Sequence, residues 1–69
     1  MMGSAIDRRG DSLLRMPEVR RRTGLSRATV YRRETDKTFP AKVILGPKMV
    51  AWYESEIERF IADPMGYRA

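Results

Sequence analysis

One short stretch, residues 23–33, limits most strongly what this chain can fold into. Gly24 can adopt the left-handed conformation that closes a helix, because it has no Cβ. Two residues later, Ser26 can accept a hydrogen bond from a free amide in the first turn of a new helix. Leu25 and Val30 occupy the two positions of a hydrophobic staple, which sets the angle at which the chain enters that helix. The stretch therefore predicts two helices joined by a tight turn, a helix-turn-helix.

The second of these helices, predicted over residues 27–35, has an outer face suited to nucleic acid. Val30 marks its buried side, given the helical repeat of about 3.6 residues per turn. The small Ala28 lies between Arg27 and Arg32 and would let the helix approach a groove closely. The two arginines can then reach guanine edges or phosphates. This is the composition expected of a recognition helix.

Other positions of the same helix have two interpretations each. The Tyr31 hydroxyl can donate to a phosphate, or the ring can cap the core, and the sequence favours neither. For Arg33 and Glu34, an ion pair or simple solvation explains the residue types better than a contact with nucleic acid.

Positive charge is concentrated on the turn motif and the segment after it. Residues 20–48 hold nine basic and two acidic residues, a net charge of +7, whereas residues 54–69 have a net charge of −2 and the whole chain +5. A polyanionic partner is favoured, because each neutralised phosphate releases condensed counterions. A merely solvated surface is the alternative. The coincidence of the charge with the turn motif favours nucleic acid.

Composition excludes several other functions. A chain of 69 residues is expected to form one domain with a small core. It has no cysteine and no histidine, so disulfides, thiolate metal sites and the commonest acid-base catalyst are absent. We therefore expect no enzyme activity, no metal and no cofactor. Without a signal peptide or a membrane-spanning run, a cytoplasmic location is the default expectation.

The segment before the motif is expected to begin with a short extended lead-in, residues 13–16, that places one leucine in the core. Pro17 then suits the first turn of a helix that ends near Thr23. Its outer surface carries Arg20, Arg21 and Arg22, of which one or two are expected to contact phosphates.

After the motif, residues 42–45 and 49–52 are rich in strand-forming side chains, and Gly46-Pro47-Lys48 between them has turn chemistry. This β-hairpin would form a wing with Lys48 at its tip. Phe39 and Trp52 are expected in the core.

The last helix is expected to start between residues 53 and 55, with Ile57, Phe60 and Ile61 as a buried stripe. Asp63-Pro64 should end it. The chain is thus divided into a flexible arm (residues 1–12), a domain (13–63) and a loose tail (64–69). The predicted fold class is α+β, mainly α: three helices and a hairpin wing.

Over residues 13–63 the chain resembles the AlpA family, small DNA-binding regulators of phages and prophages that are related to excisionases and to MerR-type winged helices. The motifs that carry the resemblance are Leu13-Leu14-Arg15-Met16-Pro17-Glu18-Val19, Thr23-Gly24-Leu25-Ser26, Thr29-Val30-Tyr31-Arg32, Phe39-Pro40, Leu45-Gly46, and Trp52 with Ser55-Glu56-Ile57. Two departures are visible. Lys37 replaces a usual glycine that closes the recognition helix, so that end is expected to be longer or differently shaped. Arg33 and Glu34 replace positions that are commonly apolar, which leaves the packing of the second turn open.

The resemblance implies a bacterial winged helix-turn-helix that binds specific double-stranded DNA and is associated with the nucleoid when bound. Regulation of prophage transcription is the leading hypothesis, with RNA polymerase or further copies of the chain as possible partners. An excisionase-like role, bending DNA for an integrase, is the alternative. A protein-interaction adaptor is the alternative from another class, and would expose an apolar patch near Met49 or Tyr53. Single-stranded RNA is disfavoured, since it calls for several exposed stacking aromatics.

The predicted mechanism places the second helix in the major groove, with base readout by Arg27 and Arg32. The first-helix arginines, Thr29, Tyr31 and Lys48 position the domain on phosphates. The full predicted set of DNA-binding residues is Arg21, Arg22, Ser26, Arg27, Ala28, Thr29, Tyr31, Arg32 and Lys48.

Overall fold

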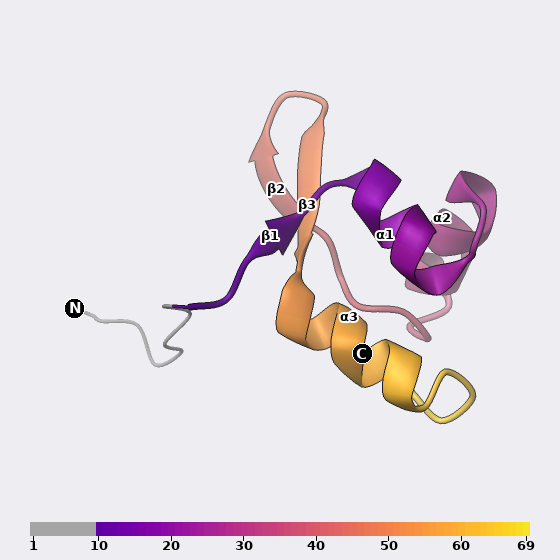
Figure 1. Cartoon of the computed structure of the whole chain (residues 1–69). Coiled ribbons are helices and arrows are strands. Elements are labelled where there is room, and N and C mark those ends of the chain that lie inside the picture. Colours follow the sequence, from indigo (N-terminus) through magenta and orange to yellow (C-terminus); the bar gives the residue numbers. More distant parts are fainter. Residues whose placement is uncertain (1–9) are drawn as a thin grey trace.

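The computed structural model describes residues 10–69, which form three helices and a three-stranded antiparallel sheet (Figure 1). This confirms the predicted α+β fold and its order, a winged helix-turn-helix. The predicted arm lies mostly outside the described residues. In chain order the elements are β1 (Leu13–Leu14), α1 (Met16–Thr23), α2 (Arg27–Thr35), β2 (Val43–Gly46), β3 (Met49–Tyr53) and α3 (Glu54–Ala62).

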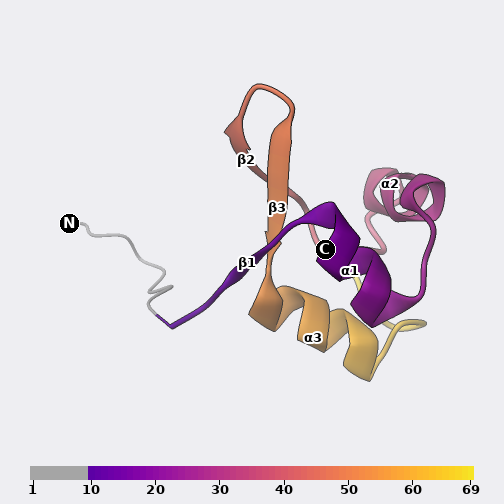
Figure 2. The same cartoon turned by 45° about the horizontal axis from the view of Figure 1, so that its top comes forward.

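The sheet has the order β1-β3-β2, so that β3 lies between the lead-in strand and its hairpin partner. Leu14 pairs with Trp52, and Val43 pairs with Ala51. Of the two leucines in β1, Leu14 is buried and Leu13 is exposed, as the prediction of one core leucine requires. The hairpin of β2 and β3 projects beyond the helices as the wing (Figures 1 and 2).

The turn between α1 and α2 has the predicted local structure. Gly24 has a φ of 74°, and its amide donates to the Arg20 carbonyl at 2.8 Å, which closes α1. The Ser26 hydroxyl accepts from the Thr29 amide at 3.2 Å, which caps α2. Leu25 packs against the core that contains Val30, as a hydrophobic staple does. Local chemistry therefore sets how α2 leaves α1.

The C-terminal end of α2 differs from the expectation for Lys37. Lys37 itself adopts the left-handed conformation, with a φ of 65°. The Thr38 amide donates to the Arg33 carbonyl, and the Lys37 amide to the Glu34 carbonyl, which is the Schellman pattern. The helix thus ends as it would with a glycine, and the predicted longer or altered end is wrong. A non-glycine residue in this conformation is strained by about 1–2 kcal/mol.

The core is built around aromatic rings from three segments. Phe39 and Trp52 are fully buried, as predicted, and the ring centroids of Phe39 and Phe60 lie 4.8 Å apart. The Trp52 indole nitrogen donates to the Pro40 carbonyl at 3.1 Å, so its polar atom is satisfied. Ile61 is the exception to the predicted stripe: it is 42% exposed, because the core reaches only Ile57 and Phe60 on α3.

Both ends of the described chain contact the domain. The Asp11 carboxylate accepts from the Ser55 amide and hydroxyl, at 3.1 and 2.7 Å, and so caps α3, whose own N-cap residue provides no side-chain bond. Tyr67 is buried with its ring centroid 5.9 Å from that of Phe60, and the Ala69 amide donates to the Lys37 carbonyl. The expectation of a loose tail is therefore wrong, because Tyr67 completes the aromatic core. The division at residues 13 and 63 stays a prediction.

No helix within residues 10–69 is long and apolar enough to span a membrane.

Candidate nucleic-acid interface

The outer face of α2 is built as predicted. Val30 is fully buried and holds the helix on the core, which leaves Ala28 and Arg32 exposed. Arg32 forms no ion pair or hydrogen bond through its side chain within residues 10–69. An exposed guanidinium beside a small residue can approach base edges or phosphates.

At the start of α2, side-chain hydroxyls serve the helix itself. Ser26 caps the first turn, and its hydroxyl also lies 2.9 Å from that of Thr29. Both residues therefore have a structural role in the helix cap. Their predicted contact with DNA stays a prediction.

Tyr31 combines the two interpretations that the sequence left open. Its ring is half-buried and packs against the core, which confirms the core-capping interpretation. The guanidinium carbon of Arg27 lies 5.6 Å from the ring centroid, and the Lys42 amine lies 5.7 Å from it. Two cations near one ring are held by cation–π attraction. The Tyr31 hydroxyl has no hydrogen-bond partner in the described part of the chain, and a phosphate contact stays a prediction.

Arg33 and Glu34 are occupied within the fold, as the simpler interpretation held. The Glu34 carboxylate forms an ion pair with the Lys42 amine at 3.1 Å and also accepts from the Lys42 backbone amide. The Arg33 guanidinium lies 5.5 Å from the centroid of the Phe60 ring. These contacts account for the second turn of α2, where polar side chains replace apolar ones.

A cleft of about 420 Å³ separates α2 from the wing. Three of its side chains are cationic, and none is a carboxylate. Arg15 is one of the three, although sequence reasoning assigned it only to the lead-in strand. The residues that line the cleft are Arg15, Met16, Pro17, Arg27, Tyr31, Lys48 and Val50.

Lys48 lies at the tip of the wing, as predicted, with an unusual backbone. Its φ is 60°, and it follows Pro47 at a position where glycine or asparagine ordinarily supplies a positive φ. Keeping a lysine there is unfavourable by about 1–2 kcal/mol. Strain of this kind is common at functional positions.

The arginines of α1 differ in their partners. Glu18 accepts from Arg21 and Arg22, with 3.0 Å between Arg21 Nε and Glu18 Oε1, and Arg22 also contacts the Glu54 carboxylate at 2.8 Å. The bonds from Arg21 and then Arg22 lower the pKa of the Glu18 carboxyl to about 2. Both arginines were predicted to contact DNA, and the acidic partners offset their charge.

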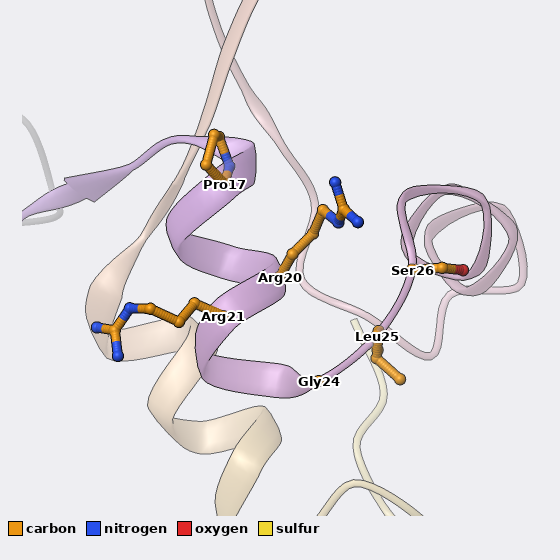
Figure 3. Close-up of a pocket in the computed structure, with 6 residues that line it drawn as sticks. All are labelled: Pro17, Arg20, Arg21, Gly24, Leu25 and Ser26. Atoms are coloured by element: carbon orange, nitrogen blue, oxygen red, sulfur yellow. The ribbon is translucent and has the colours of Figure 1, made fainter.

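Arg20 is differently placed. It lines a groove of about 550 Å³ between α1 and the start of α2. In Figure 3 its side chain extends toward Ser26, whereas that of Arg21 extends in the opposite direction. Arg20 forms no ion pair within residues 10–69. It was not in the predicted set, since spacing alone does not separate it from its neighbours.

No group of three or more acidic residues within residues 10–69 is arranged to hold a metal ion.

The three helices, the capped α2 and the wing beside it define a small winged helix-turn-helix module. The chain belongs to the family described as "Prophage CP4-57 regulatory protein (AlpA)", whose sequence model matches residues 12–65. It is 40% identical over 57 residues to "DNA-binding transcriptional activator AlpA" of Escherichia coli (strain K12), covering 74% of this chain and 81% of that protein. It is 44% identical over 58 residues to "Uncharacterized protein ORF88" of Enterobacteria phage P4, covering 84% of this chain and 66% of that protein. No solved structure matches.

Proposed function

We propose that this protein binds specific sequences of double-stranded DNA and thereby regulates transcription. The observation that carries the proposal is a set of exposed cations without acidic partners in residues 10–69: Arg32 on the outer side of α2, and Arg15, Arg27 and Lys48 around the cleft beside the wing. The name of the Escherichia coli relative, a DNA-binding transcriptional activator, supports the same function.

In the proposed complex, α2 lies in the major groove and the wing follows the DNA backbone. Arg32 reads base edges, because it is exposed and free of partners. Ala28 allows close approach. Arg27, which the sequence assigned to base readout, lines the cleft beside the wing and is proposed to contact phosphate.

The remaining positioning contacts follow from exposure and pairing. Arg20 is proposed as the principal phosphate contact of α1, since Arg21 and Arg22 are paired with Glu18. Lys48 adds a contact from the wing, and Tyr31 can donate its hydroxyl. Such contacts set the register of the protein on the duplex without reading its sequence.

The excisionase-like role uses the same surface, and the site that the protein selects would distinguish the two. Direct repeats in the selected DNA, together with bending of the duplex, would favour a role beside an integrase. A single site next to a promoter would favour regulation through RNA polymerase. One module has little surface, so several copies on repeated sites would raise the affinity.

The protein-interaction adaptor has one observation in its favour. The wing exposes three apolar side chains, with Ile44 71% exposed and both Leu45 and Met49 44% exposed. Apolar residues gathered on a projecting hairpin suit contact with another protein. This function predicts binding that depends little on salt.

The test is binding of the full chain to random-sequence duplex DNA, followed by selection of the preferred site, each at two salt concentrations. We expect weak background binding that falls steeply with salt, and a selected sequence bound at least 1,000-fold more tightly, about the lower limit for specific binders. The absence of duplex binding even at low salt would refute the proposal and favour the adaptor.

A further inference from the structure

We propose that the cleft between α2 and the wing binds one backbone phosphate of the DNA, and that Arg15 is the residue that anchors it. This inference rests on the proposed function and assigns a residue that the predicted set of DNA-binding residues does not contain.

The charge of the cleft favours an anion as its ligand. Arg15, Arg27 and Lys48 line a space of about 420 Å³ in which no carboxylate takes part. Like charges gathered against low-dielectric walls repel one another and concentrate a positive potential. The cleft beside the C-terminal end of α2 differs, because Glu34 there pairs with Lys42. Within residues 10–69, no carboxylate lines the space between α2 and the wing, so its cations attract an external anion.

Arg15 is held in place by both its backbone and its side chain. Its carbonyl accepts from the Glu18 and Val19 amides, at 3.1 and 3.0 Å, as the N-cap residue of α1. Its Nε donates to the Val50 carbonyl on the wing at 3.0 Å. The two terminal nitrogens of the guanidinium have no partner among residues 10–69. A guanidinium fixed through Nε presents these nitrogens as a pair, which is the geometry that binds phosphate oxygens.

The other groups in the cleft suit the same ligand. Lys48 supplies a point charge from the wing, Arg27 a second guanidinium, and Tyr31 a hydroxyl donor. Met16 and Val50 supply apolar wall, which strengthens the electrostatic attraction. The cleft lies beside the helix proposed to enter the major groove, where the backbone of the duplex must pass. A phosphodiester of the bound strand is therefore the ligand we infer. Free phosphate has the same chemistry and is distinguished in the test.

The test compares the wild type with Arg15→Gln, which keeps a donor for the Val50 carbonyl but removes the positive charge. Arg59→Gln is the matched control, because Arg59 lies in the last turn of α3 beside the Tyr67 ring and is not in the predicted set of DNA-binding residues. Dissociation constants are measured over a range of salt on the selected duplex and on random duplex. Arg15→Gln should weaken both by the same factor, roughly threefold to tenfold, and reduce the salt slope by about 1. Thermal unfolding of each variant verifies the fold.

A second arm locates the contact. Duplexes with a neutral methylphosphonate at one backbone position are scanned with both proteins. The wild type should lose affinity at one position where Arg15→Gln loses none, because the partner of that phosphate is already absent.

Three results would overturn the inference. Arg15→Gln with wild-type affinity and slope would leave Arg15 only its structural bond to Val50. If both proteins lost the same affinity at every methylphosphonate position, Arg15 would not contact a backbone phosphate. Binding of inorganic phosphate at Arg15, seen as a shift of its side-chain Nε resonance, without any effect of Arg15→Gln on DNA would make the cleft a small-anion site. In all three, specific binding by the wild type would persist, so the proposed function would stand.

Discussion

Two groups of arginines differ in their surroundings. Arg21 and Arg22 on α1 have acidic partners, whereas those on the α2–wing face (Arg15, Arg27 and Arg32) do not. On α1, Arg21 and Arg22 are held by Glu18, and Arg22 also by Glu54. On the other face, Arg15, Arg27 and Arg32 have no acidic partner within residues 10–69. In the first group, Arg21 is paired within α1 and Arg22 links α1 to α3; the second group is available to an external anion.

This difference shows why a count of charges is a weak guide to a binding surface. All these arginines contribute equally to the net charge of +5 of the chain, but an ion pair must be broken or shared before its arginine can bind phosphate. Paired cations stabilise the fold, whereas unpaired cations beside a cleft can bind an anionic ligand. Substitutions in the paired group and in the unpaired group, made one at a time, test this difference.

The largest effect is expected for Arg32→Ala. If Arg32 makes a bidentate base contact, its loss should cost about 1–3 kcal/mol of binding free energy on the selected site and little on random DNA. Arg21→Ala, the matched change on α1, should alter neither affinity by more than a few tenths of a kcal/mol. The measurement is a dissociation constant on both duplexes. Equal weakening by Arg32→Ala on every sequence would reduce Arg32 to a phosphate contact.

Smaller effects are expected for the two lysines with positive φ. Replacing either one with glycine should raise stability, but only one replacement should weaken DNA binding. Lys48→Gly and Lys37→Gly should each raise the free energy of unfolding by about 1 kcal/mol, since glycine adopts this conformation without strain. Only Lys48→Gly should weaken DNA binding, because Lys48 lines the cleft and Lys37 does not. Urea unfolding and DNA titration of both variants measure this. Wild-type DNA affinity in Lys48→Gly would show that Lys48 does not contact the DNA.

The smallest effect is expected for Glu18→Gln, which releases Arg21 and leaves Arg22 paired with Glu54. Binding to random DNA should rise by about twofold to threefold at low salt, since the freed arginine can reach phosphates. A fall would mean that the Glu18 pairs orient the interface.

The same variant should change the stability profile in acid. The pKa of the Glu18 carboxyl is lowered by its arginine partners from 4.5 to about 2, so its contribution to stability is present above pH 4.5. That contribution is lost as the pH falls from 4.5 toward 2. Thermal unfolding between pH 6 and pH 2, with Glu18→Gln as reference, should show a steeper decline in the wild type. Parallel declines would contradict the pairing.

Much of the fold could be predicted because its signals are local. Gly24 and Ser26 close and open neighbouring helices through bonds that span three or four residues. The turn after Gly46 and the apolar runs around it specify a hairpin without reference to the rest of the chain. Trp52 is a large aromatic in a small chain, where burial is the simplest outcome.

What could not be predicted depends on contacts between distant residues. Arg15 reaches Val50 over 35 positions, and Asp11 reaches Ser55 over 44. No local pattern indicates either contact. Tyr67 follows the proline that ends the last helix, and only the folded chain brings it back to the core.

Pairing limited the prediction of the interface in the same way. The sequence identified a basic helix and wing. The pairs of Glu18 with Arg21 and Arg22 lie three and four residues apart on one helix, so the spacing could have indicated them, but the Arg22–Glu54 pair depends on how α1 packs on α3. Spacing gave no reason to prefer Arg20, whose orientation toward α2 follows from the helix crossing (Figure 3).

The most direct test of the central claim is an NMR titration of the protein with its selected duplex, observing the arginine side-chain Nε resonances. We expect the resonances of Arg15, Arg27 and Arg32 to shift strongly at stoichiometric DNA. Arg21 and Arg22, paired within the fold, should shift little. Large shifts for the paired arginines, with the α2–wing face unchanged, would contradict the central claim.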